Sequence, residues 1–312
     1  MVTIKKIEIK GFFGKGDFEW NLDPVVNILG GKNGSGKSTI FKMCYAMLSD
    51  KNLLASMEGS VKKIFKEMTL TFSNNWTLYW PYDSEMLRLA YDGNKPMAYI
   101  DSILVRDEKG QKQKLEELQK QVSCYLINSF EQHLDKAIQY AQQPRSISLN
   151  NPTMLDIMIY DQINLRNKYF SETMENLIDS SDEMDRKRKE YAEIYKKTYS
   201  ILEKFLKTYD KPFKSSFEFS KDGEKFSYEH LSMGEKQILL LSLMVGNVNQ
   251  KPCVFFMDEP DLSMHIDWKE ILIKQLHELN PNMQIIVSTH APSVITGWKD
   301  RVEEVNHLTI KK

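Results

Sequence analysis

The chain has 312 residues, which is enough for about two domains. Hydrophobic residues make up 41% of it and charged residues 27%, so composition excludes collagen, a disulfide scaffold and a wholly disordered chain. Lys and Arg number 42 against 43 Asp and Glu, and the net charge is −1. That balance excludes a strongly basic nucleic-acid coat but leaves room for a local basic stripe.

Cysteine usage and hydropathy bound the cellular location. Cys44, Cys124 and Cys253 lie too far apart for a CxxC zinc site, and so few cysteines favour a reducing compartment. The N-terminus lacks the apolar core of a signal peptide, and the apolar run 238–246 is shorter than the roughly 20 residues that a membrane span needs. We therefore expect a cytoplasmic protein without membrane contact.

Residues 1–109 are expected to form a β-rich part around one helix. Residues 2–9 alternate as in a half-buried strand, although the repeat slips by one between Ile4 and Ile7. The nearly continuous apolar run 25–29 predicts a buried parallel strand, which leads into a Gly-rich loop. The other elements expected here are a strand at Phe18 and Trp20, a helix over 39–48, a hairpin over 70–80 and a strand over 98–105.

Residues 110–212 are expected to be a helical insertion. Apolar residues recur every three or four positions from Leu115 to Leu134, which predicts an amphipathic helix. Further helices are predicted over 153–178 and 182–209. The length of these helices favours an ordinary helical subdomain over a coiled-coil lever.

Residues 213–312 return to strands. A hairpin with an Asp-Gly turn is predicted over 217–228. It is followed by a helix, strand, helix and strand over 234–246, 253–257, 264–279 and 284–288. Such a βαβ succession predicts a parallel sheet, so the fold class is α/β.

Residues 31–38, GKNGSGKS, match the phosphate-binding pattern G-x-x-x-x-G-K-[ST]. They lie between a predicted buried strand and a predicted helix, which is the context that the motif requires. Backbone N–H groups of such a loop surround phosphates, Lys37 reaches the β/γ-phosphates and the Ser38 hydroxyl binds Mg²⁺.

Three further segments carry chemistry. The apolar strand 253–257 ends in Asp258 and Glu259, which can hold Mg²⁺ through water and accept the proton of an attacking water. His290 ends the next strand and can point at the same phosphates. Ser232 and Glu235 fit a capping box, and Ser232 and Gly234 also fit an anion site at a helix N-terminus.

These elements, in this order, resemble the motifs of ABC-type ATPases: Walker A at 31–38, signature at 231–237, Walker B at 253–259 and switch histidine at 290. Asn33, the GEKQ form of the signature and the opening IKKIEIKGF resemble the SMC/RecF/OLD branch. Residues 258–265 and 288–292 are similar to compact OLD-like and Septu-type anti-phage ATPases. The resemblance covers roughly 1–109 and 213–312. It implies a P-loop NTPase fold, an ABC-type head with an N-terminal β-rich lobe and an inserted helical subdomain.

The resemblance assigns roles by position. It implies that Glu259 polarises the lytic water, that His290 senses the γ-phosphate, and that Ser38 and Asp258 hold Mg²⁺. Ser232, Gly234 and Glu235 would close over ATP bound to the other subunit, with Ser263 at the D-loop. The ATP contacts implied are Gly31, Asn33, Gly34, Ser35, Gly36, Lys37, Ser38 and Thr39. The implied cofactors are ATP and Mg²⁺, and the implied assembly is a head-to-head homodimer, with higher oligomers left open.

The sequence also departs from the family pattern. The Q-loop glutamine has no assigned position, and the candidates are Gln111, Gln113, Gln119 and Gln121. His265 stands where many ABC proteins carry Asp, although the OLD-like branch often has His. The insertion is far shorter than SMC arms. OLD nucleases carry a TOPRIM domain after the ATPase, and we expect none in the residues after His290.

The leading hypothesis is an Mg²⁺-dependent ATPase whose ATP-driven dimerisation gates a separate effector, a nuclease or toxin, in anti-phage defence. The alternative is a RecF/SMC-like DNA-repair ATPase that binds DNA itself. It needs a basic surface, for which Lys5, Lys6, Lys10, Lys15 and residues 186–189 are the candidates. A transporter subunit is disfavoured by the motif wording and the helical insertion.

Overall fold

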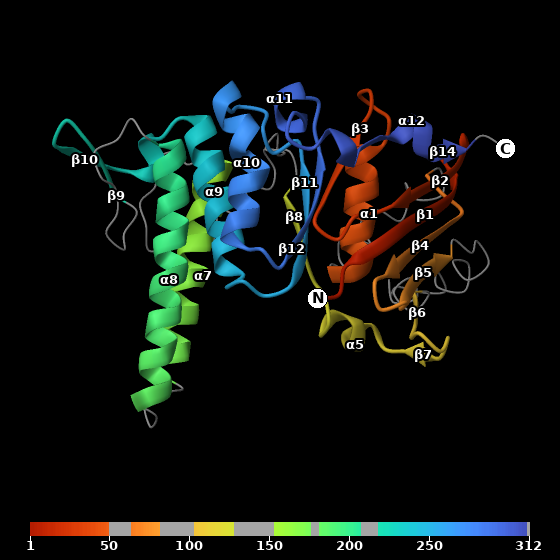
Figure 1. Ribbon diagram of the computed structural model, residues 1–312, viewed down its shortest axis with the longest axis horizontal. Helices are drawn as coiled ribbons and strands as arrows, with labels where there is room; N and C mark the ends of the chain where they lie inside the picture. The colour runs from red at the N-terminus through yellow and green to blue at the C-terminus, as the bar shows by residue number, and fades with distance from the viewer. Residues whose placement is uncertain (50–63, 82–102, 128–152, 176–180, 207–217, 311–312) are drawn as a thin grey trace, which may run out of the picture. The chain divides into compact units, whose positions relative to one another are not determined.

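The protein folds as two compact units. The structure, a computed structural model, describes residues 1–49, 64–81, 103–127, 153–175, 181–206 and 218–310 (Figure 1). The first unit comprises residues 1–128, 252–260 and 282–312, and the second comprises residues 129–251 and 261–281. Sequence-distant segments therefore build each unit.

A five-stranded parallel sheet forms one layer of the first unit. Its strand order is β13-β3-β12-β11-β8, and parallel pairing joins every neighbour. The strands are β3 (Val26–Gly30), β8 (Ser123–Ile127), β11 (Cys253–Asp258), β12 (Met283–Ser288) and β13 (Val302–Glu304). Every residue of β3, β11 and β12 is buried, as expected for central strands of a parallel sheet. The predicted parallel sheet is confirmed.

A seven-stranded antiparallel sheet forms the other layer, in the order β14-β2-β1-β4-β5-β6-β7. Its strands are β1 (Ile4–Phe12), β2 (Gly16–Asn21), β4 (Glu67–Phe72), β5 (Thr77–Pro81), β6 (Leu104–Arg106), β7 (Lys112–Gln113) and β14 (Thr309–Ile310). The slipped repeat in the first strand corresponds to a register shift between Ile4 and Lys6. The predicted hairpin is β4–β5. Of the strand predicted over 98–105, residues 98–102 lie outside the described residues.

Helix α1 (Lys37–Ser49) lies between these two sheets (Figure 1). Its buried face joins one hydrophobic core that includes residues of β1 and β4 on one side and of β11 on the other. The rings of Phe41 on α1 and Phe256 on β11 lie 5.3 Å apart between centroids. Helix α1 follows β3 in the chain, and the core holds it against the parallel sheet. Its N-terminus therefore lies at the edge where the strands of that sheet end. Among the described residues, the C-terminal part of this unit also forms the short helices α11 (Pro292–Ile295) and α12 (Val305–Leu308) and the 3-10 turn η3 (Lys299–Arg301).

The helix predicted from Leu115 to Leu134 is wrong over most of its described length. Only α5 (Leu115–Gln119) is helical, and β8 then runs beside β11 in the parallel sheet. The residues Ser-Cys-Tyr-Leu-Ile of β8 form a short apolar run, which periodicity alone does not separate from a helix. Pairing with β11 decides the outcome, because it satisfies the backbone of a buried segment. Residues 128–134 lie outside the described part of the chain.

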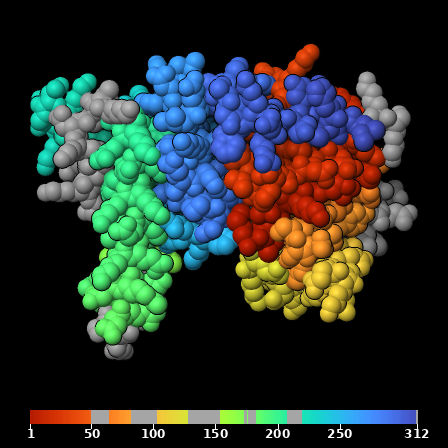
Figure 2. Space-filling model, viewed as in Figure 1, coloured from red at the N-terminus to blue at the C-terminus, as the bar shows by residue number. Residues whose placement is uncertain are grey.

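The second unit is a helical bundle with one hairpin. Helices α7 (Met154–Glu175) and α8 (Ser181–Phe205) confirm the two long helices predicted for the insertion. Both pack with α9 (Met233–Asn247), α10 (Ile266–Leu279) packs with α8 and α9, and α8 is exposed along its length on the face shown in Figure 2. The predicted Asp-Gly hairpin is β9 (Glu218–Lys221) and β10 (Glu224–Ser227), followed by the 3-10 turn η2 (Tyr228–His230). Among the helices that the structure describes, none is long and apolar enough to cross a membrane.

Candidate active site

The phosphate-binding motif forms the loop between β3 and α1. Gly31, Gly34 and Gly36 all have positive φ angles, at 141°, 74° and 103°. Gly36 shows why a side chain is excluded, because a Cβ there would lie 2.6 Å from the ring of Phe12 and 2.7 Å from that of Phe13. The backbone of the loop is thereby held in the curled path that such a motif needs.

Lys37 is the buried cation of this loop. Only 5% of the residue is exposed, and its Nζ donates to the carbonyl of Gly31 at 2.9 Å. The same Nζ lies 2.9 Å from Nε2 of His290, so a charged Lys37 donates to an unprotonated Nε2. Burial lowers the pKa of Lys37, and the carboxylates of Glu259 and Asp258 oppose that shift.

Two carboxylates follow β11 at the same edge of the sheet. Asp258 is buried, and its Oδ1 accepts a hydrogen bond of 2.5 Å from the hydroxyl of Ser288. Glu259 is part-exposed, and its Oε1 lies 3.3 Å from Nε2 of His290. The backbone of Glu259 has a φ of 49°, a strained value for a residue with a side chain. Its N–H donates to the carbonyl of Ser288 at 2.9 Å, which helps to hold that conformation.

The first unit therefore brings three predicted residues together. Lys37, Glu259 and His290 come from three different segments, and both Lys37 and Glu259 contact the imidazole of His290. Asp258 joins them through the electrostatic field at Lys37. A cation, a carboxylate acceptor and a histidine in contact can bind an anion and move a proton beside it.

The loop itself fits a phosphate group. The Oγ of Ser35 is buried and has no hydrogen-bond partner among the described residues, so the loop holds a polar atom that a ligand can satisfy. A Cβ on Gly34 would meet nothing within 4 Å, so space lies open beside the loop. The N-terminus of α1 adds N–H donors and positive potential. Ser38 is the second residue of that helix, next to Lys37, and its hydroxyl and the Asp258 carboxylate are oxygen donors of the kind that bind Mg²⁺.

The signature residues belong to the second unit. Ser232 caps α9, and the predicted capping box is confirmed: the N–H of Ser232 donates to Glu235 Oε2 at 2.8 Å, and the N–H of Glu235 to Ser232 Oγ at 3.5 Å. A Cβ on Gly234 would lie 2.5 Å from the carbonyl oxygen of Ser263. Gly234 therefore lets the segment that carries Ser263 lie against the start of α9. Lys236 forms a buried ion pair of 2.7 Å with Asp156 on α7.

Three exposed apolar side chains lie close in sequence to the signature and to Ser263. Met233, Leu262 and Ile266 expose 49%, 46% and 59% of their surface. They adjoin Gly234 and Ser263, which are in close contact. His265 is exposed and acts as the N-cap of α10, where its Nδ1 accepts from the N–H of Asp267.

Sequence reasoning did not assign a role to several residues that shape the site. Ser288 donates a hydrogen bond to Asp258. In the sequence, its position just before Thr289 and His290 was the only feature that could have marked it. Phe12 and Phe13 pack on Gly36, and no motif marks them. The four candidate Q-loop glutamines precede β8, so they do not follow the carboxyl end of that strand, where ligands of parallel sheets bind. Gln119 instead donates to the carbonyl of Leu48 on α1 at 2.6 Å.

The fold and the site define the class of protein, an α/β protein with a phosphate-binding loop and the P-loop fold of SMC head domains. The SMC head domain from Thermotoga maritima matches with a TM-score of 0.53 and 14% identity, over 96% of this chain and 94% of that one. An Smc head bound to the C-winged helix domain of ScpA matches with a TM-score of 0.52 and 14% identity, over 94% and 91%. At this identity the likeness shows the fold alone.

Sequence comparison gives the family. Residues 126–296 match the family described as "AAA domain, putative AbiEii toxin, Type IV TA system", and the chain belongs to it. The chain is also similar to the retron Vc95 probable ATPase of Vibrio cholerae serotype O1 biovar El Tor, with 31% identity over 100 residues. That match covers 28% of this chain and only 20% of the retron protein.

Proposed function

We propose that the protein hydrolyses ATP with Mg²⁺, dimerises around ATP and thereby gates a separate effector, a nuclease or toxin, in anti-phage defence. The observation that carries the proposal is the contact of Lys37 and Glu259 with His290 beside the phosphate-binding loop. Residues 31–39 would bind ATP through the loop backbone, Ser35 and Lys37.

The residues at the edge of the sheet supply the chemistry. Glu259 orients a water and accepts its proton, and His290 lies within reach of the same water and of Lys37. Mg²⁺, held by Ser38 and Asp258, would neutralise phosphate charge when bound. Ser288 fixes the Asp258 carboxylate through its 2.5 Å hydrogen bond.

An exposed apolar patch supports dimerisation. Met233, Leu262 and Ile266 present large apolar side chains to solvent beside the signature and Ser263. Clusters of this kind mark interaction surfaces. We propose that this face closes over ATP held by a second copy, so that Ser232, Gly234 and Glu235 complete the partner's site.

The separate effector rests on resemblance. The motifs at 258–265 and 288–292 are similar to those of anti-phage ATPases, and the family description names a toxin of a type IV TA system. The similarity to a probable retron ATPase adds support over 100 residues.

The charges do not favour the alternative of a DNA-binding repair ATPase. Of the basic residues proposed for a DNA-facing surface, Lys6, Lys10, Arg186, Lys187 and Arg188 each form an ion pair with a nearby carboxylate. Such pairs offset the positive potential that duplex DNA requires.

Glu259→Gln tests the proposal. The amide cannot take a proton, so ATP and Mg²⁺ should bind while turnover falls by about 100-fold or more. ATP should then accumulate with the protein as a dimer on a sizing column, and removal of Mg²⁺ with a chelator should prevent this. Glu270→Gln, an exposed glutamate on α10, is the matched control and should turn over like the wild type. Wild-type turnover in Glu259→Gln, or a monomer with ATP shown to be bound, would contradict the proposal.

A further inference from the structure

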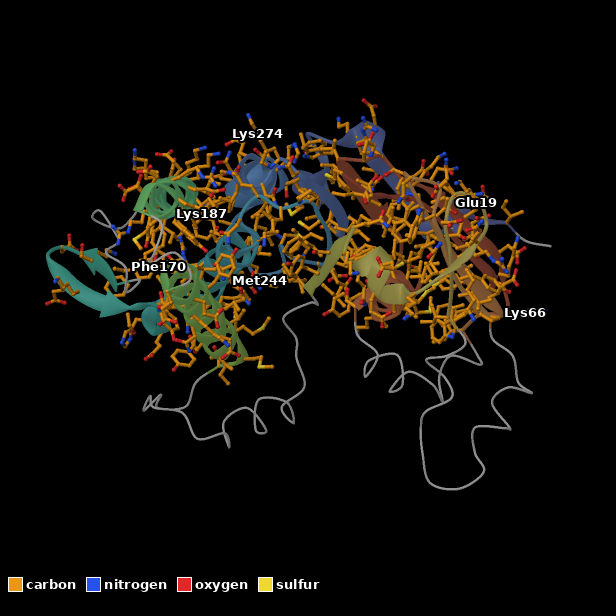
Figure 3. All side chains as sticks on the ribbon, turned by 90° about the horizontal axis from the view of Figure 1, so that it is seen from below. Glu19, Lys66, Phe170, Lys187, Met244 and Lys274 are labelled. Carbon is orange, nitrogen blue, oxygen red and sulfur yellow. The ribbon has the colours of Figure 1, made fainter. Side chains whose placement is uncertain are left out.

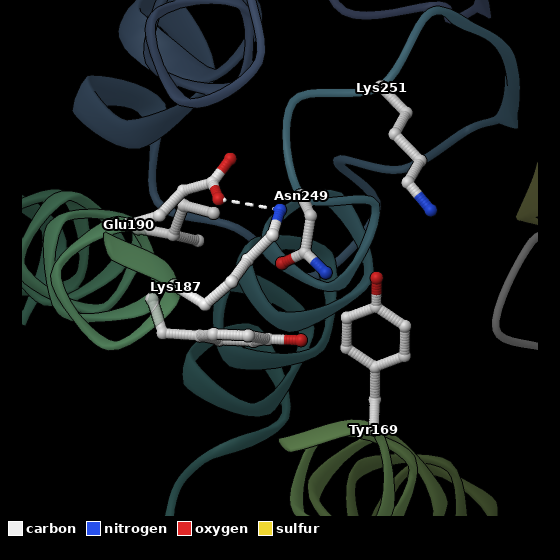
Figure 4. Close-up of a pocket in the computed structure, with 7 residues that line it drawn as sticks. Tyr169, Lys187, Glu190, Asn249 and Lys251 are labelled. Atoms are coloured by element: carbon white, nitrogen blue, oxygen red, sulfur yellow. Dashed lines mark hydrogen bonds and ion pairs between the residues drawn. The ribbon is translucent and has the colours of Figure 1, made fainter. Parts of the chain in front are cut away.

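The second unit contains a cavity of about 170 Å³ between α7, α8 and the turn after α9 (Figure 4). The residues that line it are Tyr169, Lys187, Glu190, Tyr191, Ile194, Asn249 and Lys251. The proposed roles in ATP hydrolysis use none of them. The cavity is therefore separate in sequence and in chemistry from the phosphate-binding loop.

Aromatic rings form two sides of this cavity. Tyr191 is 9% exposed, and its ring centroid lies 5.8 Å from that of Tyr169, which is 39% exposed. Phe170 packs edge-on against Tyr191 at 5.4 Å and is itself 43% exposed. Figure 3 labels Phe170 on α7 and Lys187 on α8, and Lys187 lies about one helical turn from Tyr191. A flat apolar ligand would find ring surface there on which to pack.

The polar groups suit a ligand with a negative charge. Lys251 Nζ lies 5.6 Å from the centre of the Tyr169 ring, and Lys187 is paired with Glu190 at 2.9 Å. Two lysines and one glutamate leave the lining with one net positive charge. Asn249 points its amide toward the Tyr169 hydroxyl (Figure 4). The cavity thus offers a cation, an amide and a carboxylate around aromatic surface.

The turn after α9 has a left-handed backbone at Asn249 and Gln250. Asn249 and Gln250 have φ angles of 54° and 56°, two successive residues in the left-handed region where glycine costs least. They follow the end of α9, where the N–H of Asn249 donates to the carbonyl of Gly246 at 3.0 Å. Asparagine is among the non-glycine residues that adopt this conformation most readily, so the turn presents the Asn249 amide at the cavity at small cost.

We propose that this cavity binds a nucleotide unit, a heteroaromatic ring that carries a phosphate. The ring packs against Tyr169 and Tyr191, the phosphate contacts Lys251, and the amide of Asn249 meets the polar edge of the ring. The same unit occurs in a free mononucleotide and in a single strand. The free mononucleotide fits better, because the ion pairs of Arg186, Lys187 and Arg188 with carboxylates offset positive charge that a long phosphate backbone would need.

The test uses full-length protein with Lys37→Ala, so that the phosphate-binding loop does not contribute. Calorimetry measures binding of the four ribonucleoside 5′-monophosphates, and anisotropy measures binding of labelled single-stranded RNA and DNA. We expect at least one monophosphate to bind. Asn249→Gly and Lys251→Gln should each weaken that binding roughly tenfold.

Gln250→Gly is the matched control. It relieves the same backbone strain as Asn249→Gly but leaves the Asn249 amide in place, so it should bind like its parent. Thermal unfolding should show that both glycine variants fold, since each removes a left-handed non-glycine residue. If no monophosphate binds but single-stranded RNA or DNA does, and Asn249→Gly abolishes that binding, the same site would take its nucleotide unit from a single strand. Failure of every probe to bind, or equal affinity in Asn249→Gly and Gln250→Gly, would overturn the proposal.

Discussion

At the residue scale, Lys37 is the side chain whose environment is most informative. It is buried, yet among the described residues no carboxylate forms a direct ion pair with it; the carbonyl of Gly31 accepts from it, and Nε2 of His290 lies 2.9 Å from its Nζ. Burial lowers its pKa, so the charged form is less stable in the folded protein than in water. A phosphate brought to the loop would supply the missing counter-charge, and part of the affinity for ATP should come from that compensation.

Lys37→Ala should therefore weaken ATP binding strongly. The substitution removes the cation that faces the β/γ-phosphates, and we expect the dissociation constant to rise at least about tenfold, as for loss of one charge-assisted hydrogen bond. Calorimetry with a non-hydrolysable ATP analogue measures this directly. Lys42→Ala removes a lysine from the same helix α1 and should leave the affinity within error. Equal affinities for the two variants would argue against the phosphate-binding role of the loop.

Individual residues also show how much of the candidate site could be predicted from the sequence. Lys37, Glu259 and His290 could be predicted because their motifs place them at the carboxyl ends of strands that share one edge. Ser288 could not, because a serine before a histidine has no distinctive pattern, and its hydrogen bond to Asp258 depends on the pairing of β11 with β12. The strained φ of Glu259 is likewise a product of tertiary structure.

At the element scale, the signature at the start of α9 has a role in folding as well as its proposed role in closing over ATP. Its capping box satisfies helix N–H groups, while Gly234 allows Ser263 to approach its first turn. A serine, a glycine and a glutamate at that start are thus explained by folding before any nucleotide is considered. Residues 123–127 show the limit of such reasoning, because an apolar run that fits a helical period also suits a strand once β11 offers a partner.

Gly234→Ala tests whether the contact between α9 and the Ser263 segment is needed for ATP hydrolysis. The new Cβ would lie 2.5 Å from the Ser263 carbonyl oxygen, so the segment carrying Ser263 must move away from α9. ATP should still bind through the loop, while steady-state hydrolysis should fall about tenfold or more if Ser263 and the signature act together. Gly297→Ala is the control, since a Cβ there meets nothing within 4 Å. Wild-type hydrolysis in Gly234→Ala would show that this contact is not needed for turnover.

The ion pair between Lys236 and Asp156 should stabilise the second unit through α9 and α7. Both side chains are almost fully buried, at 8% and 5% exposed, so Asp156→Asn leaves an uncompensated charge. We expect the free energy of unfolding to fall by about 3–5 kcal/mol in urea denaturation. Adding Lys236→Met should recover part of that loss, because the lone charge is then removed. Lys196→Met breaks an exposed pair with Glu193 on α8 and should cost less than about 1 kcal/mol.

At the scale of the whole molecule, the predicted site motifs are divided between two units. The phosphate-binding loop, Glu259 and His290 belong to the first unit, and the signature and Ser263 belong to the second. The order of motifs along the sequence predicted both sets but not this grouping, because residues 252–260 and 282–312 leave the helical unit to join the parallel sheet. The predicted boundaries at 109 and 212 rest on composition and helical period, which do not detect that β8 pairs with β11.

The proposed dimer makes a prediction that no single-chain site shares. If each ATP lies between the loop of one subunit and the signature of the other, Lys37→Ala and Ser232→Arg proteins are each inactive alone. In a mixed dimer, one composite site combines both lesions and the other has neither. Mixing the two proteins should therefore restore ATP hydrolysis to a fraction of the wild-type rate, measured by phosphate release after subunit exchange.

The controls decide what an unrestored rate means. Mixing Lys37→Ala with wild type shows whether subunits exchange, and a tag on one variant allows the mixed dimer to be isolated. An isolated mixed dimer that stays inactive would mean either that both sites must fire together or that each site lies within one chain. A mixed dimer carrying Lys37→Ala and Ser232→Arg on the same subunit beside a wild-type subunit separates these cases. There each composite site has one lesion, so restored activity would place both residues in one chain's site and contradict the head-to-head arrangement.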